Sequence, residues 1–385
     1  MPMKKSLALY IHIPFCKVKC TYCDFYSVKG RETEIPNFIN TLLLEINATF
    51  RHFDTDDYEI SSLFFGGGTP GLFKASHIKT ILDAFKREIS FAKDTEITIE
   101  ANPGETSQKT FVGYLQAGVN RLSMGAQSFN DANLKFMTRI HDAKQISESY
   151  RDARMAGFNN INLDLIFGLP NQTLEDWTND LDKITSLNPE HISAYSLTVE
   201  EGTALHRWVQ NGHVELMEDL KDLEMFHFTK EFLAKYGYSK YEISNYTKDG
   251  FECRHNLHYW LNRPYLSFGP AAHSYFNQQR WANVRNLSLW QSDIHNHQFA
   301  FIKTENIDMT KAKNEMIFTR LRLLQGLDLS EFNSAFKDDF LQSFDMTIKK
   351  WLPNFIKIDN NCLKLTDLGF EIADEITSDF MLEED

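Results

Sequence analysis

The amino-acid sequence predicts an α/β protein with a partial (β/α)6 barrel, followed by a smaller, mainly helical C-terminal domain. Three observations lead to this prediction. Strand patterns and amphipathic helix patterns alternate about six times over residues 1–200. Two of the helical patterns stop at glycines, Gly118 and Gly157, as helices often do at their C-termini. After Glu200 the alternation ends, and a charged helix and an aromatic-rich segment replace it.

The first 200 residues supply the repeated units. Residues 6–13 alternate polar and apolar side chains like a half-buried strand, and a helix over residues 36–50 has Pro36 in its first turn. The later units combine strands at 60–65, 96–100, 121–127, 160–167 and 191–197 with helices at 78–89, 108–117, 146–156 and 174–187. Successive strand-then-helix units indicate a parallel sheet, which right-handed crossovers curl into a barrel or partial barrel.

The rest of the chain lacks this alternation of strands and helices. A charged helix at 214–236, a short strand at 241–244 and an aromatic segment at 253–260 follow the barrel. We expect residues 201–305 to complete the barrel and residues 306–385 to form a separate domain. Helices followed by a strand near 362–365 and a last helix are typical of a winged-helix arrangement.

Composition excludes some classes of function. A chain of 385 residues with 42% hydrophobic and 24% charged content can form a large globular domain and a smaller one. Its net charge of -13 opposes non-specific binding to nucleic acid, which requires a basic surface. Because no stretch resembles a signal peptide or a transmembrane segment, we expect a cytoplasmic protein.

Three cysteines lie together in the loop after the first strand: Cys16, Cys20 and Cys23. Three neighbouring thiols that cannot pair evenly suggest that they bind a metal or a cluster. A cubane iron–sulfur cluster normally takes four cysteines, so three would leave one iron open to an outside ligand. A zinc site needs four protein ligands, and His12 is the nearby candidate for the fourth. Zinc and unligated thiols remain the alternatives.

Polar residues at the C-terminal ends of strands form a second set of candidates. Active sites of barrels lie at these ends, where Gly66–Gly68, Glu100, Gln127 and Asp164 fall. The glycine run lets backbone N–H groups approach a ligand closely. Asp164 interrupts an apolar run, where an unpaired charge is costly, and a sugar diol would satisfy such carboxylates. Arg139 and Gln127 complete a polar pocket, or serve as a salt-bridge partner and a strand-end cap.

The aromatic segment contains a third set, His255, His258, Tyr259 and Trp260. Neutral imidazole is a common metal ligand, and a histidine among aromatic rings suits a flat cofactor. A packed segment with a hydrogen-bonded histidine is the alternative.

Together these motifs resemble the radical S-adenosylmethionine (SAM) superfamily, whose signature is Cys-x-x-x-Cys-x-x-Cys. Residues 10–16, 66–70 and 162–170 are similar to the branch that contains oxygen-independent coproporphyrinogen III dehydrogenase and the HemW-like haem chaperones. The resemblance implies that Cys16, Cys20 and Cys23 hold a [4Fe–4S] cluster with SAM on its open iron. It also implies that the SAM site is lined by Tyr10, Tyr22, Gly67, Gly68, Thr69, Glu100, Gln127, Arg139 and Asp164.

Two departures separate the chain from the dehydrogenases. They have a fourth cysteine two residues after the third, where this chain has Phe25, and a longer N-terminal extension. Residues 255–260 match the His-Asn-x-x-Tyr-Trp motif of the HemW-like chaperones, which implies a haem-binding role for His255, with His258 as the other candidate axial ligand.

We therefore expect a chaperone that binds haem and passes it to a haem-requiring acceptor, while the cluster and SAM support or gate the transfer. An electron donor is a further expected partner. The alternatives are an oxygen-independent coproporphyrinogen III oxidase and a zinc-stabilised binding protein.

Overall fold

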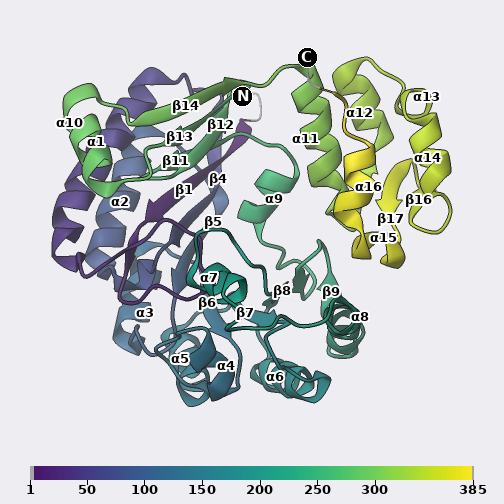
Figure 1. Ribbon diagram of the computed structural model, residues 1–385. Helices are drawn as coiled ribbons and strands as arrows, with labels where there is room; N and C mark the ends of the chain where they lie inside the picture. Colours follow the sequence, from purple (N-terminus) through teal and green to yellow (C-terminus); the bar gives the residue numbers. More distant parts are fainter. Residues whose placement is uncertain (1–3, 384–385) are drawn as a thin grey trace.

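The computed structural model describes residues 4–383, and twelve strands of this part form one curved sheet. The sheet wraps into an open barrel, and a smaller domain lies beside it (Figure 1). The strand order is β14-β13-β12-β11-β1-β4-β5-β6-β7-β8-β10-β9, so β14 and β9 are its two edges. The predicted fold class, a partial α/β barrel with a mainly helical C-terminal portion, is confirmed.

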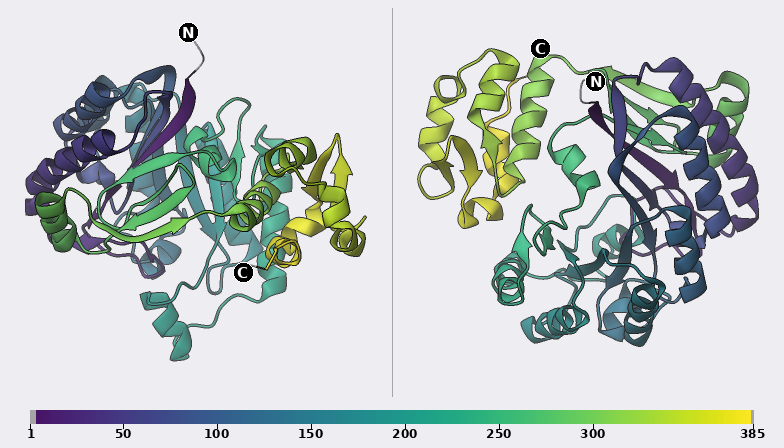
Figure 2. Two further views of the ribbon diagram at one scale, coloured as in Figure 1. Left: turned by 90° about the horizontal axis from the view of Figure 1, so that it is seen from above. Right: turned by 180° about the vertical axis from the view of Figure 1, so that it is seen from behind.

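Six strands at the centre run parallel in chain order and form the partial barrel. They are β1 (Lys5–Ile13), β4 (Tyr58–Gly67), β5 (Phe91–Ala101), β6 (Arg121–Gln127), β7 (Ile161–Phe167) and β8 (His191–Ser196). The helices that follow them cover the outer face of the sheet (Figure 2). They are α1 (Ile35–His52), α2 (Ala75–Glu88), α3 (Gln108–Ala117), α5 (Ala143–Ala156) and α6 (Leu174–Leu187).

Local signals account for these helices. Phe38, Leu42 and Ile46 share one face of α1 and are buried against the sheet. The helix α5 begins with a capping box between Asp142 and Gln145. It ends at Gly157, whose φ of 112° lies in the left-handed region that glycine adopts without strain.

Residues after the sixth strand extend both sides of the sheet. On one side β11 (Tyr265–Phe268) pairs parallel with β1, and three antiparallel strands follow: β12 (His273–Phe276), β13 (Gln279–Asn283) and β14 (Phe301–Asn306). On the other side lie β10 (Asn245–Thr247) and β9 (Ser239–Lys240).

The predicted strand at 241–244 is wrong, because these residues form the turn between β9 and β10. The Glu242 carboxyl group stabilises the turn by accepting hydrogen bonds from the Ser244 backbone N–H, at 3.2 Å, and from the Asn245 side chain.

The helices and short strands that remain outside the C-terminal domain connect these parts. They are α4 (Asp131–Phe136), α7 (Ala204–Gln210), α8 (Asp219–Lys235), α9 (Arg254–Trp260) and α10 (Leu287–His297), with β2 (Phe15–Cys16), β3 (Val28–Lys29), η1 (Glu32–Glu34) and η2 (Pro70–Leu72). Figure 1 shows α9 between the sheet and the C-terminal helices. No helix within residues 4–383 is both long and apolar enough to cross a membrane.

The C-terminal portion has a hydrophobic core of its own, built around residues such as Phe332, Phe340 and Trp351. Its elements are α11 (Met309–Leu321), β15 (Leu327–Asp328), α12 (Leu329–Phe336), α13 (Phe340–Ser343), α14 (Asp345–Trp351), β16 (Ile356–Asp359), β17 (Cys362–Leu365), α15 (Asp367–Glu371) and α16 (Ala373–Asp379). Polar contacts hold this portion against the barrel, including His227 Nε2 with Glu371 Oε1 at 2.7 Å.

Candidate functional site

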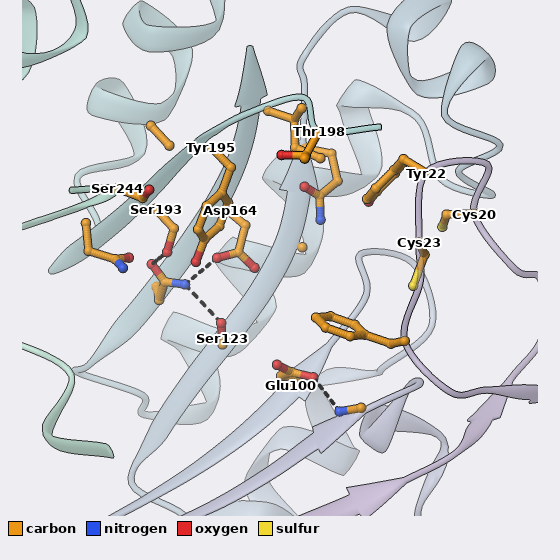
Figure 3. Close-up of a pocket in the computed structure, with 18 of the residues that line it drawn as sticks. Cys20, Tyr22, Cys23, Glu100, Ser123, Asp164, Ser193, Tyr195, Thr198 and Ser244 are labelled. Carbon is orange, nitrogen blue, oxygen red and sulfur yellow. Dashed lines mark hydrogen bonds between the residues drawn. The ribbon is translucent and has the colours of Figure 1, made fainter. Parts of the chain in front are cut away.

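A cavity of about 790 Å³ runs from the C-terminal ends of the parallel strands into the barrel, as far as Arg121 and His191, the first residues of β6 and β8. The cysteine loop forms one end of it, strands β5 to β8 form its wall, and the β9–β10 turn and α9 form the other end. In Figure 3, Cys20 and Cys23 lie on one side, Ser193 and Ser244 lie on the other, and Asp164 lies between them. We call these the cysteine end and the inner end of the cavity.

The three cysteines of the loop line the cysteine end as half-buried free thiols. Thr69 Oγ1 donates a hydrogen bond to Cys16 Sγ at 3.5 Å, and Arg139 Nη1 donates one to Cys20 Sγ at 3.4 Å. The hydrogen bond from Thr69 opposes the effect of burial, which raises the pKa of the Cys16 thiol. Within residues 4–383, no three His, Cys, Asp or Glu side chains converge closely enough to hold a single metal ion. What the loop offers is three sulfur ligands on one wall of the cavity.

His12, the predicted fourth zinc ligand, does not face the cavity. Its Nε2 lies 2.8 Å from the Tyr26 carbonyl oxygen, and its Nδ1 lies 3.3 Å from the Tyr10 hydroxyl. Burial lowers the pKa of His12 to about 4, so the ring is neutral and acts as a packing residue.

Two half-buried carboxyl groups, Glu100 and Asp164, lie in the middle of the cavity wall. Burial and the nearby charge of Asp164 raise the pKa of Glu100 to about 8, and burial also raises the pKa of Asp164. Asn162 Nδ2 donates to Asp164 Oδ1 at 2.7 Å and to Ser123 Oγ at 2.9 Å, which fixes the position of the aspartate. A cation placed beside these groups would favour their ionised forms.

The glycine run serves a different purpose from the one that the sequence indicates. The N–H groups of Gly67, Gly68 and Thr69 donate to Glu100 Oε2, Ile13 O and Phe15 O, at 3.2, 2.7 and 2.8 Å. These three N–H groups therefore form hydrogen bonds within the protein rather than with a ligand. A Cβ atom on Gly67 would lie 2.7 Å from the His12 ring, so glycine is required for this close packing. The run still lines the cavity, and it presents backbone surface there.

Most of the residues expected around SAM lie on the cavity wall: Tyr22, Gly67, Gly68, Thr69, Glu100, Gln127, Arg139 and Asp164. Tyr10 does not line the cavity and instead stacks on Phe64, with ring centres 6.2 Å apart. Gln127 ends β6 with a φ of 69°, a left-handed conformation that is uncommon for a side-chain-bearing residue. Arg139 Nη2 donates to Asn102 Oδ1 at 2.6 Å and to Gly125 O at 2.9 Å.

The aromatic segment forms α9, and its side chains divide between two faces. Cys253, Asn256 and Trp260 line the inner end of the cavity. His255 and His258 point into the barrel core, and each is 2% exposed.

Both ring nitrogens of His255 lie within hydrogen-bond distance of a hydroxyl group. Its Nδ1 lies 3.1 Å from Ser62 Oγ and its Nε2 lies 2.9 Å from the Tyr259 hydroxyl. Burial lowers the pKa of His255 to about 3. His258 Nε2 lies 2.7 Å from Ser61 Oγ. Neither imidazole is a cavity-lining ligand in this arrangement.

Several cavity residues escape the sequence prediction. They are Asn102, Arg121, Ser123, Asn162, His191, Ser193, Glu242, Asn245 and Arg322. A period-two pattern could have identified Asn162, because it shares one face of β7 with Asp164. The residues of the inner end come from several distant segments, so no local pattern marks them.

Haem chaperones named HemW resemble this chain along all or most of its length. It is 35% identical to the haem chaperone HemW of Haemophilus influenzae over 395 residues, which covers 100% of both chains. The chain belongs to the HemW family. Another member, from Escherichia coli, is 39% identical over 336 residues and covers 85% of each chain.

Two family models and one solved structure agree with this membership. The radical SAM superfamily model matches residues 10–184, and the HemN C-terminal domain model matches residues 309–372. The coproporphyrinogen III oxidase HemN of E. coli has the same fold, with a TM-score of 0.86, 24% identity and coverage of 98% of this chain and 90% of that one. The cysteine end of the cavity lies within the radical SAM match.

Proposed function

We propose that this chain is a haem chaperone, which binds haem and delivers it to a haem-requiring acceptor protein. The observation that carries the proposal is the similarity, over 73–100% of this chain, to proteins named haem chaperone HemW, at 30–39% identity. The coproporphyrinogen III oxidase alternative is weaker, because the similarity to that enzyme is limited to the fold.

Membership of the radical SAM superfamily implies a [4Fe–4S] cluster and SAM. The donor set fits both: Cys16, Cys20 and Cys23 would hold the cluster, and Thr69 and Arg139 would stabilise two of the thiolates. When bound, the cluster supplies an electron. Cluster assembly on free thiols needs a reducing compartment, which agrees with a cytoplasmic protein and a separate electron donor.

The cavity wall offers SAM a matching environment. Glu100 and Asp164 would ionise beside a cationic sulfonium and amino group, and their oxygens would accept hydrogen bonds from ribose hydroxyls. Tyr22, Gln127 and Arg139 would orient the molecule, and Gly67, Gly68 and Thr69 would bound it. Tyr10 would act from behind the wall, through its stack on Phe64.

Haem would lie along α9 at the inner end. For His255 to ligate its iron, the imidazole must give up its contact with Ser62 or with Tyr259 and turn toward the cavity. The hydroxyl of Ser62 therefore competes with haem for Nδ1. His258 would have to leave Ser61 in the same way.

The test is an anaerobic haem titration of the cluster-loaded chain, followed by Soret absorbance. We expect saturable binding at one haem per chain, which is lost in His255→Ala and kept in the exposed control His297→Ala. Ser62→Ala frees Nδ1 without removing the ligand and should bind at least as tightly as the wild type. Absence of saturable binding in the wild type would refute the proposed function.

A further inference from the structure

Four buried polar atoms at the inner end of the cavity have no hydrogen-bond partner within the described residues. They are Arg121 Nε, Asn245 Oδ1, Trp260 Nε1 and Arg322 Nε. All four residues line the cavity, and they come from β6, β10, α9 and the segment after α11. Arg121 is 2% exposed and Asn245 is 3% exposed. Buried polar groups in folded proteins are nearly always hydrogen-bonded, so unpartnered atoms on one cavity wall point to a ligand.

Two guanidinium groups lie among these residues. Arg121 Nε forms a buried ion pair with Glu96 Oε2 at 3.9 Å, a separation too long for a hydrogen bond, so Nε keeps its donor unused. Arg322 Nη1 pairs with the exposed Asp374 Oδ1 at 3.3 Å, and its buried Nε has no hydrogen-bond partner among the described residues. Glu242 also lines this end of the cavity. Burial raises the pKa of its carboxyl group, which reduces the electrostatic repulsion between Glu242 and a bound carboxylate.

The chemical types of the unpartnered atoms indicate which kind of ligand would bind. Three of the four atoms are N–H groups, and two of these belong to guanidinium ions, which bind carboxylates in a planar geometry. The cavity also carries apolar side chains from β7, α8 and the β9–β10 turn: Ile166, Phe167, Phe226 and Ile243. A flat apolar molecule with a carboxylate at its edge fits both sets.

We infer that the inner end is a carboxylate-binding subsite, formed by Arg121, Trp260 and Arg322, that takes a propionate group of the bound haem. This inference rests on the proposed haem binding and specifies how the haem is oriented. Arg322 belongs to the C-terminal portion, so that portion closes the subsite over the ligand. It stacks over Trp260, with its guanidinium carbon 5.5 Å from the ring centre, which holds the two donors side by side.

The experiment compares haem with haem dimethyl ester, whose carboxylates are blocked, in anaerobic titrations of the cluster-loaded chain. Arg322→Met removes the guanidinium at nearly constant length, and Trp260→Phe removes the indole N–H but keeps a ring. The control Arg254→Met lies on α9 as well, but Arg254 pairs with Asp94 away from the cavity. We expect about a tenfold loss of haem affinity in each cavity variant and no change in the control.

The ester should bind the wild type about tenfold more weakly than haem, and Arg322→Met should not weaken it further. Equal binding of haem and its ester, with wild-type affinity in both cavity variants, would overturn the subsite and leave the proposed function intact. Loss of SAM affinity with unchanged haem affinity would assign the carboxylate to SAM and also overturn it. No haem binding by the wild type would overturn the subsite together with the proposed function.

Discussion

The two ends of the cavity are built in different ways. At the cysteine end and along the middle of the wall, the thiols, the glycine run and the carboxyl groups come from short motifs on or after single strands, and many of their polar atoms already have partners in the protein. At the inner end, residues from four distant segments leave polar atoms unpartnered. The difference indicates a preorganised cofactor site beside a site that is completed only by its ligand.

The largest expected effect is at the cysteine end. Cys20→Ala should abolish the cluster, because it removes one of three thiolate ligands and leaves Arg139 Nη1 without its sulfur partner. Iron and acid-labile sulfide, measured after anaerobic reconstitution, should fall to background while far-UV circular dichroism stays unchanged. Full iron and sulfide content in this variant would remove Cys20 from the ligand set. Cys362→Ala, outside the cavity, is the matched control.

Asp164→Asn should weaken SAM binding by about 10- to 100-fold, since it removes a charge-assisted hydrogen-bond acceptor. Isothermal titration of the cluster-loaded protein measures the effect. The control Asp83→Asn changes an aspartate that pairs with Lys79 on the surface of α2. Unchanged affinity in Asp164→Asn would exclude this carboxylate from the site.

SAM affinity should rise with pH and level off above about 8, where Glu100 is ionised in the free protein. Below this pKa, a cationic ligand must displace a proton from Glu100, which costs up to about tenfold in affinity per pH unit for one proton. Titrations between pH 6 and 9 should show this slope, and Glu100→Gln should flatten it. A wild-type profile that is flat throughout would contradict a cationic ligand beside Glu100.

The smallest effect on ligand binding is expected for Glu45, a buried carboxyl group outside the cavity. Its oxygens accept from Gly269 N at 2.8 Å, Asn283 Nδ2 at 2.6 Å and Trp290 Nε1 at 3.2 Å, so it needs no ligand. Glu45→Gln puts an NH2 group against one of these donors and should cost about 1–3 kcal/mol of unfolding free energy. Chemical denaturation checks the loss, while SAM and haem affinities should not change.

The pH dependence of stability provides a second check on Glu45. Burial raises its pKa to about 7 in the folded protein, against 4.5 for the ordinary group. The stabilisation is therefore full below pH 4.5 and is lost as the pH rises through 7. The wild type should lose this contribution between about pH 4.5 and 7, and Glu45→Gln should not. The same slope in both proteins would assign the effect to another group.

The barrel could be predicted from sequence because each unit carries its own signals. The predicted bounds of α3, β6 and α6 match the structure, and local caps mark the ends of both helices: Ser107 and Gly118 for α3, Thr173 and Asn188 for α6. The strands β11 to β14 escaped prediction because they are short and their pairing is set by distant neighbours. The turn at 241–244 read as a strand because its stabilising contact is a side-chain hydrogen bond from Asn245 to Glu242.

The candidate site divides in the same way. Cys16 was visible because it lies with two other cysteines in one loop, and Glu100 and Asp164 because they end or interrupt a strand pattern. The hydrogen bonds of His255 could not be predicted from the sequence, because its partner Ser62 is 193 residues away in the chain. The role of Arg322 was equally hidden, since only the fold brings it to the cavity beside Trp260.

The central claim is that one cavity holds the cluster at one end and haem at the other. Zinc protoporphyrin IX, which is fluorescent and carries the propionates of haem, tests it directly. We predict that its fluorescence lifetime is strongly shortened when it binds the cluster-loaded protein, and that the lifetime recovers in cluster-free Cys20→Ala with the porphyrin still bound. An equal lifetime in both proteins would place the porphyrin away from the cluster and contradict the account.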